Sequence, residues 1–268
     1  MLGKLMKYEW KASWKLLLPM NLFIVVTSLF AYVTIQLSFF DSESALVIMT
    51  GTFVMMAYVL SLIVVFIVTM IFLVYRAYKS VYGDEGYLLH TLPVDKHHII
   101  IAKVVMSAVW MLINIFLIYS SIVFIVSTQN EFMENILEGF SYYAELVNEY
   151  GDINGFDIFM TFVAAFVTLI AKILKFGACI SLGQLSSNHK VLTSFGFYYG
   201  IHFVQKIFDM LHLVFLEVML ESGVNTAATP ASLSVGSSWA FDLISNLIYC
   251  VAFYFATWYV MEKKLNLE

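Results

Sequence analysis

Six predominantly apolar stretches alternate with short polar segments along this chain of 268 residues. Each stretch is long enough for an α-helix to cross the hydrocarbon core of a bilayer, which takes about 20 residues. The predicted spans are 16–37, 47–75, 99–126, 157–182, 191–216 and 239–261. The second is longer than one crossing needs, so it is expected to tilt or to project from the membrane. A count that divides the second stretch, or omits the more polar fifth, stays open.

The composition supports the same class of protein. Hydrophobic residues make up 61% of the chain and charged residues only 12%, with a mean hydropathy of +0.86. These values lie far from those of soluble domains. The prediction is an all-α, polytopic membrane protein whose six-span domain covers 16–261 and leaves no length for a separate soluble enzyme domain. Cys179 and Cys250 both fall inside apolar stretches, which argues against a disulfide framework.

The basic residues fix the expected orientation. They gather before the first span, around the second connection, near the fourth connection and at the C-terminal end of the chain. These residues are Lys4, Lys7, Lys11, Lys15, Arg76, Lys79, Lys96, Lys103, Lys190, Lys263 and Lys264. The connections 38–46, 127–156 and 217–238 contain acidic residues but no Lys or Arg. The positive-inside rule therefore places both termini, including the tail 262–268, on the cytoplasmic side of the plasma membrane.

Two segments outside the spans have amphipathic periodicity. In 1–15, apolar residues recur at helical spacing opposite a lysine face, which predicts a separate helix lying on the inner leaflet. Trp10 and Trp14 are expected to anchor it at the interface. In 130–150, aromatic and aliphatic residues alternate with glutamates, which predicts an acidic helix on the outer surface. A packing role for that helix is favoured over substrate recognition, because amphipathic stripes are ordinarily packing faces.

Ionisable residues also occur inside the predicted spans, where each is energetically costly. Lys172 and Lys175 lie in the inner half of the fourth span, and their long side chains are expected to reach back to the interface. Lys206 of the fifth span can pair with Asp209 at i,i+3 spacing or with Asp242 of the sixth. A structural ion pair is favoured slightly over a substrate contact.

The connection 76–98 is the most polar segment between spans and the strongest candidate for a functional element. Gly83 and Gly86 permit tight turns, and Asp84 can cap a short helix. Three histidines, His90, His97 and His98, are ligand types found in metal sites, but their spacing fits no zinc pattern. The chain has no Gly-x-x-x-x-Gly-Lys-Ser/Thr motif, so ATP hydrolysis would require another chain.

One part of this connection carries a family resemblance. The segment Tyr82-Gly83-Asp84-Glu85-Gly86-Tyr87-Leu88-Leu89-His90-Thr91-Leu92-Pro93-Val94, followed by Lys103, resembles the segment after the second span in permease subunits of bacterial ABC transporters. The family is the type V exporter, or ABC transporter type 2, family. The opening Lys7-Tyr8-Glu9-Trp10-Lys11 and the six-span layout are also similar to it.

The resemblance implies a dimer of permeases, identical or homologous, resting on two ABC ATPase subunits that hold ATP and Mg. The chain would itself be no enzyme and would hold no cofactor or metal. The resemblance also implies a cytoplasmic coupling helix between spans two and three. This helix would contain Tyr82, Gly83, Asp84, Glu85, Gly86, Tyr87 and Leu88. In that family the second and fifth spans of opposing protomers line the route of the cargo.

The expected function is export of a hydrophobic or amphipathic cargo by alternating access, such as a membrane-active peptide, toxin, lipid or drug-like molecule. The candidate wall of the route is apolar and consists of Met55, Met56, Tyr58, Phe195, Tyr198 and Tyr199. The nearby pair Gly196 and Gly200 would permit close helix approach. The alternatives are an ion-coupled secondary transporter using Lys206, Asp209 and Asp242, and a membrane-embedded enzyme. A nucleic-acid partner is not expected.

Overall fold

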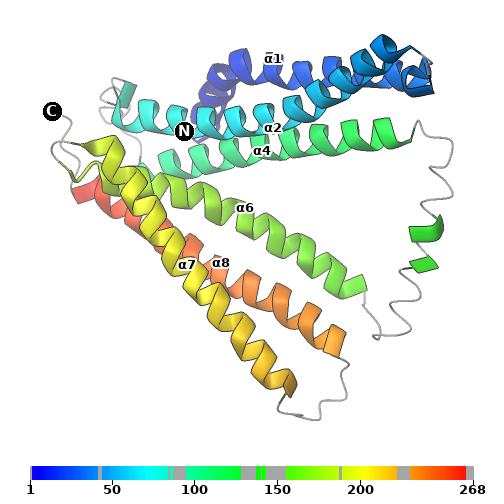
Figure 1. The fold of residues 1–268 in the computed structure, drawn as a ribbon. Helices are drawn as coiled ribbons and strands as arrows, with labels where there is room; N and C mark the ends of the chain where they lie inside the picture. The colour runs from blue at the N-terminus through cyan, green and yellow to red at the C-terminus, as the bar shows by residue number, and fades with distance from the viewer. Residues whose placement is uncertain are drawn as a thin grey trace. The chain divides into compact units, whose positions relative to one another are not determined.

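The computed structural model describes residues 2–41, 44–83, 85–86, 95–127, 137–139, 141–142, 155–186, 189–221 and 230–263. Every regular element in these ranges is helical (Figure 1). The elements are α1 (Leu2–Gln36), η1 (Phe39–Asp41), α2 (Ala45–Tyr82), α4 (Lys96–Val126), α6 (Gly155–Gly183), α7 (Lys190–Glu221) and α8 (Pro230–Lys263). The predicted all-α class is confirmed.

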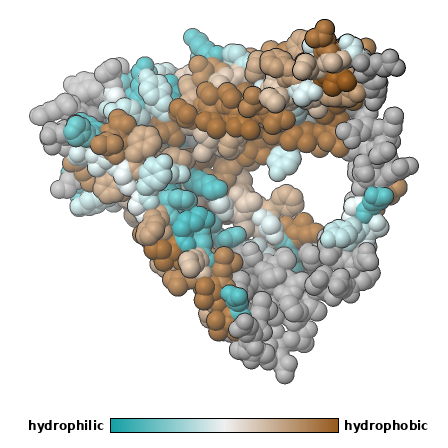
Figure 2. All heavy atoms as spheres, in the orientation of Figure 1, coloured by the Kyte–Doolittle hydropathy of each residue, from teal (hydrophilic) through white to brown (hydrophobic). Residues whose placement is uncertain are grey.

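Five helices in the described ranges are long and apolar enough to cross a membrane: α1, α2, α4, α6 and the Trp239–Lys263 part of α8. Many of their large apolar side chains are exposed, as at Phe53 (72%) and Phe116 (70%). Apolar residues cover much of the visible surface (Figure 2). A soluble protein rarely exposes so much contiguous apolar surface. The chain is therefore a multi-pass helical membrane protein.

Helix α7 is not one of these five, although it has 32 residues. Gln205, Lys206 and Asp209 lie within it and lower its hydropathy. The predicted count of six spans is accordingly not confirmed.

Several predicted boundaries differ from those in the structure. The segment 1–15 and the first span form one continuous helix, α1, in which Pro19 lies. Figure 1 shows the N-terminal turns of α1 inclined to the rest of the helix, as an internal proline allows. Helices α7 and α8 both extend into the predicted loop 217–238, because helix formation is not limited by the hydrocarbon core and Pro230 suits a first helical turn.

The predicted acidic helix falls mostly outside the described residues. Within 130–150 only residues 137–139 and 141–142 are described, and these are helical.

The chain divides into two compact units. Unit 1 comprises Met1–Arg76 and Val105–Phe140, and unit 2 comprises Ala77–Val104 and Ser141–Glu268. Helices α2 and α4 each contribute to both units.

Unit 1 is held by apolar packing and by polar contacts between its helices. Ala31 of α1, Tyr58 of α2 and Ile125 of α4 form a buried cluster. Near the other end of α1, the rings of Trp10 and Trp110 stack with centroids 4.6 Å apart. Trp10 therefore packs within unit 1, and its role as an interfacial anchor stays a prediction.

In unit 2, helix α6 packs against both α7 and α8. Asn246 of α8 donates a 3.0 Å hydrogen bond to the hydroxyl of Thr168 on α6. At the turn between α6 and α7, a Cβ on Gly183 would overlap the side chain of Ser194 and lie 2.7 Å from the carbonyl oxygen of Lys190. Glycine therefore permits the close approach of these two helices.

Candidate functional site

The candidate site is the segment between α2 and α4, residues 83–95, which we call the connector. The structure describes Gly83, Glu85, Gly86 and Asp95 in it. Of the predicted coupling residues, Tyr82, Gly83, Glu85 and Gly86 are described, whereas Asp84, Tyr87 and Leu88 lie outside the described residues.

Two glycines form the turn that begins the connector. The amide of Gly83 donates to the carbonyl of Lys79 at 3.2 Å, and that of Gly86 donates to the carbonyl of Gly83 at 2.8 Å. A Cβ on Gly83 would lie 2.7 Å from the Lys79 carbonyl oxygen, and one on Gly86 would overlap the carbonyl of Val81. The backbone at both positions is too close to accommodate a side chain without a shift.

The last turns of α2 are fastened to α6. The hydroxyl oxygens of Tyr82 and Ser181 are 2.5 Å apart. Ser181 donates its own proton to the carbonyl of Gly177 at 2.8 Å, so Tyr82 is the donor to Ser181. Tyr82 lies seven residues beyond the predicted span, which ends at Tyr75.

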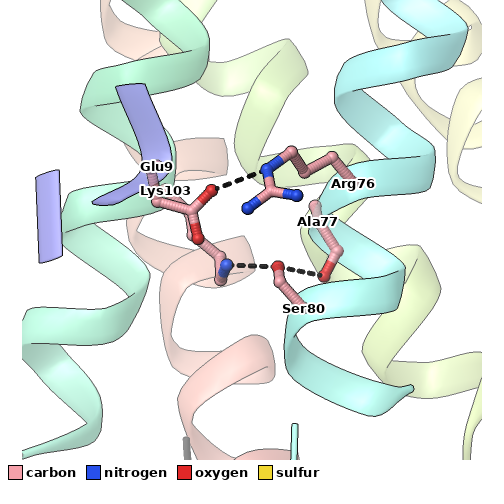
Figure 3. A network of polar contacts seen from close by, with 5 residues as sticks. All are labelled: Glu9, Arg76, Ala77, Ser80 and Lys103. Carbon is pink, nitrogen blue, oxygen red and sulfur yellow. Dashed lines mark hydrogen bonds and ion pairs between the residues drawn. The ribbon is translucent and has the colours of Figure 1, made fainter. Parts of the chain in front are cut away.

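The same end of α2 is also joined to α4 within unit 2. Lys103 of α4 donates through Nζ to the hydroxyl of Ser80, which in turn donates to the carbonyl of Ala77 at 3.4 Å (Figure 3). In unit 1, Arg76 Nε and Glu9 Oε2 form an ion pair at 3.1 Å, also drawn in Figure 3. Glu9 belongs to the Lys7–Lys11 segment that carries part of the family resemblance.

The far end of the connector is fastened to the C-terminal turns of α8. Lys96, the first residue of α4, donates through Nζ to the carbonyl of Met261 at 2.7 Å. The same Nζ lies 3.3 Å from Glu262 Oε2. Met261 is buried, so this backbone contact fixes Lys96 at the surface of a packed helix.

An aromatic stack reinforces this attachment. His97 Nδ1 and the hydroxyl of Tyr254 are 2.5 Å apart. The imidazole also stacks on Tyr254 and Trp258, with centroids 5.9 and 5.6 Å away and planes within 19° and 13° of parallel. The start of α4 is therefore held against one face of α8 by both polar and aromatic contacts.

The histidines do not form a metal site in the part of the chain that the structure describes, which contains no group of three or more His, Cys, Asp or Glu able to hold a metal ion. His97 is used in the aromatic stack, and His98 Nδ1 lies 3.6 Å from Asp95 Oδ2. His90 lies outside the described residues.

Of the two pairings left open for Lys206, the structure has the one within α7. Lys206 Nζ lies 3.1 Å from Asp209 Oδ2, and both side chains are exposed. Asp242 instead uses its backbone carbonyl, which accepts hydrogen bonds from Ser245 and Asn246.

Lys175 does not reach back to the interface. Its residue is 5% exposed, and Nζ donates to Gln205 Oε1 on α7 at 2.7 Å. Nζ also lies over the ring of Tyr198, 4.5 Å from the centroid. Lys172, three residues earlier, is exposed. The interpretation of Lys175 as an interfacial lysine is wrong, because α7 provides it with an acceptor and an aromatic face inside the bundle.

The predicted wall residues of α2 differ in environment within unit 1. Tyr58 is 5% exposed, and its hydroxyl lies 3.0 Å from that of Ser121. Met55 packs against the buried cluster of Ala31, Tyr58 and Ile125. Met56, by contrast, is 59% exposed. Among these three, only Met56 presents most of its surface outside unit 1.

The wall residues of α7 divide in the same way within unit 2. Phe195 and Tyr199 are exposed. Tyr198 is half-buried and stacks on Phe176 of α6 with centroids 5.0 Å apart. A Cβ added to Gly196 or Gly200 would meet no atom within 4 Å, so this flank of α7 is open.

Sequence reasoning missed two features of the interior. One is the hydrogen-bonded set of Asn21, Thr69 and Asn114 in unit 1. The other is the contact of Lys175 with Gln205 in unit 2. Polar residues within apolar stretches were the available signal, but a single sequence does not show which helix faces meet.

Comparison with known proteins finds no matching family model, no matching curated protein and no matching solved structure.

Proposed function

We propose that this chain is the transmembrane permease subunit of an ATP-driven exporter of the ABC class, located in the plasma membrane with both termini in the cytoplasm. It moves a hydrophobic or amphipathic cargo outward by alternating access. In this proposal α7 is a sixth span. Its 32 residues extend over about 48 Å, more than the roughly 30 Å of the hydrocarbon core.

The observation that carries the proposal is the attachment of the connector at both ends. Tyr82 joins the end of α2 to α6, and Lys96 and His97 join the start of α4 to α8. In this proposal, movement at either end of the connector is passed to α6 or α8 through these contacts. This is the mechanical property that a coupling element needs, because rigid contacts are what convey a two-state motion between sites.

The ATP-consuming step belongs to partner chains in this proposal. Two ATPase subunits bind ATP and Mg and close against each other, and the connectors of two permease protomers follow that motion. The contacts of Tyr82 and Lys96 then rearrange α6 and α8, and the route changes its open side. The resemblance of residues 82–94 to the coupling segment of bacterial ABC permeases supports this assignment.

The test begins with isolation of the complex. The tagged chain is expressed in its native host, purified in mild detergent, and its co-purifying subunits are identified by mass spectrometry. We expect a protein with a P-loop in a ratio of one to each permease. Recovery of the chain alone, together with transport that follows an ion gradient and not ATP, would favour the secondary-transporter alternative based on Lys206, Asp209 and Asp242.

The connector is then tested in the purified complex. Glu85→Ala is expected to leave insertion intact and to reduce cargo-stimulated ATP hydrolysis. Glu217→Ala is the matched control, because Glu217 is an exposed glutamate near the C-terminal end of α7. It is expected to have no effect on ATP hydrolysis. Equal activity of the two variants would exclude Glu85 from coupling.

A further inference from the structure

Lys175 is a buried cation with neutral partners. Its side chain lies in unit 2 between α6 and α7 and is 5% exposed. The only hydrogen bond from Nζ in the described part of the chain goes to Gln205 Oε1, at 2.7 Å, although an ammonium has three N–H donors. The other contact of Nζ is the face of Tyr198, 4.5 Å from the centroid.

The ammonium is directed into the bundle rather than toward the turn between α6 and α7. Lys175 precedes the last residue of α6, Gly183, by eight residues, whereas Gln205 follows the first residue of α7, Lys190, by fifteen. At 1.5 Å per residue these positions lie about 12 Å and about 22 Å along their helices. Nζ therefore lies deeper than its own Cα, as expected for a side chain that leans toward the N-terminus of its helix.

The surroundings do not neutralise this charge. Among the described residues, no ion pair includes Lys175. Lys172 of α6 and Lys206 of α7 are themselves cations and provide no counter-charge. Asp209, four residues after Gln205 on α7, is paired with Lys206. A buried charge is normally paired, and an ionisable residue inside a membrane domain usually marks a functional position.

We propose that Lys175 and Gln205 form a recognition site for the anionic head group, a carboxylate or phosphate, of an amphipathic molecule. Nζ contributes charge and N–H donors, and the Gln205 amide nitrogen contributes two more donors, because its oxygen already accepts from Lys175. The stacked rings of Phe176 and Tyr198 offer an adjoining apolar surface. The ligand enters when α6 and α7 separate during transport. This inference rests on the proposed exporter function and narrows the cargo to anionic amphiphiles.

Binding is measured on the purified full-length chain in phosphatidylcholine nanodiscs, without ATPase or ATP. The probes are radiolabelled dodecyl phosphate and dodecanoate, with dodecyltrimethylammonium as the cationic counterpart, each corrected for uptake by empty nanodiscs. We expect saturable binding of the anionic probes only. The Lys175→Gln variant should bind the anionic probes roughly tenfold or more weakly, the loss expected for one charge-assisted contact. The Lys175→Arg variant should retain most of the binding.

Two further variants separate recognition from a structural contact. Lys172→Gln removes an exposed lysine from the same helix and is expected to leave binding unchanged. Gln205→Glu places a carboxylate beside Nζ, so it should preserve or strengthen the contact between α6 and α7 while abolishing anion binding. This variant also decides the question if Lys175→Gln does not fold.

A final arm identifies the source of the anion. If phosphatidylglycerol in the nanodisc competes with the anionic probes, the site binds a membrane lipid. If phosphatidylglycerol does not compete, the site binds a transported molecule. Equal binding of the cationic and anionic probes, or full anion binding by Gln205→Glu, would overturn the proposal. Because no ATPase takes part, these outcomes are independent of whether the chain co-purifies with one.

Discussion

Asn114 on α4 donates a 2.9 Å hydrogen bond through Nδ2 to Oδ1 of Asn21 on α1, and both side chains are buried inside unit 1. The same amide nitrogen lies 3.3 Å from the hydroxyl of Thr69 on α2. One side chain thus connects α1, α2 and α4. In an apolar interior such a bond also selects one rotational setting of the helices, because other settings leave the amides unpaired.

Replacing Asn114→Leu should therefore lower the stability of unit 1. Asn21 and Thr69 would lose their shared partner, and the expected loss is about 1 kcal/mol, in the range measured for polar contacts between membrane helices. Unfolding by titration with a denaturing detergent measures the change. Ser120→Leu is the control, because Ser120 is exposed and, within the described residues, its hydroxyl bonds only to its own helix. Equal stability of the two variants would show that the amide connection contributes nothing.

Gly86→Ala should distort the connector. The new Cβ would overlap the carbonyl of Val81, and relief of that overlap costs about 1–3 kcal/mol. The expected result is faster proteolytic cleavage between residues 83 and 95 and reduced transport. Gly3→Ala, where a Cβ meets no atom within 4 Å, should be neutral. Unchanged cleavage of Gly86→Ala would contradict the described turn.

Tyr82→Phe should loosen the attachment of α2 to α6 without altering packing. The ring remains, and only the donor to Ser181 is removed. We expect ATP hydrolysis by the reconstituted complex to continue while transport per ATP declines, by severalfold if the hydrogen bond contributes about 1 kcal/mol to coupling. Ser181→Ala should act alike, and the double variant should be no worse than either single one. Additive losses would mean that the two hydroxyls act separately.

The orientation can be tested by labelling in a background without Cys179 and Cys250. Lys7→Cys and Glu217→Cys both replace exposed residues. A membrane-impermeant maleimide should label the Glu217 variant in intact cells and the Lys7 variant only after the membrane is opened, because lysine-rich segments mark the cytoplasmic side. The reverse pattern would invert the topology.

Neighbouring methionines on α2 allow a test of the cargo route. Met56 is exposed and Met55 packs inside unit 1. Met56→Ser should change cell resistance to membrane-active peptides without lowering thermal stability. Met55→Ser should lower stability by about 2 kcal/mol, since it removes packed apolar volume and buries a hydroxyl. Unchanged resistance in the Met56→Ser variant at normal expression would exclude this part of α2 from the cargo route.

The helices themselves could be predicted from the sequence because each apolar stretch is long and uninterrupted. Predicted boundaries were less accurate where the hydrocarbon core no longer constrains the chain. Helix α2 continues past residue 75 to Tyr82, and α7 continues past residue 216 to Glu221. The turn at Gly83 and Gly86 was predicted from glycine alone, since few other residues permit so close a backbone approach.

By itself, the sequence determined that the chain is helical and membrane-embedded, because hydrophobic length and internal backbone hydrogen bonding leave no other spanning structure in this class. Only the tertiary structure decided which polar residues meet. The sequence predicts an interfacial position for Lys175, but the packing of α7 places Gln205 and Tyr198 in contact with it. Asn21 and Asn114 are 93 residues apart in the chain, and their contact depends on how α1 and α4 are rotated about their axes. Such rotations are set by the joint packing of many side chains, and hydrophobic periodicity within one helix does not encode them.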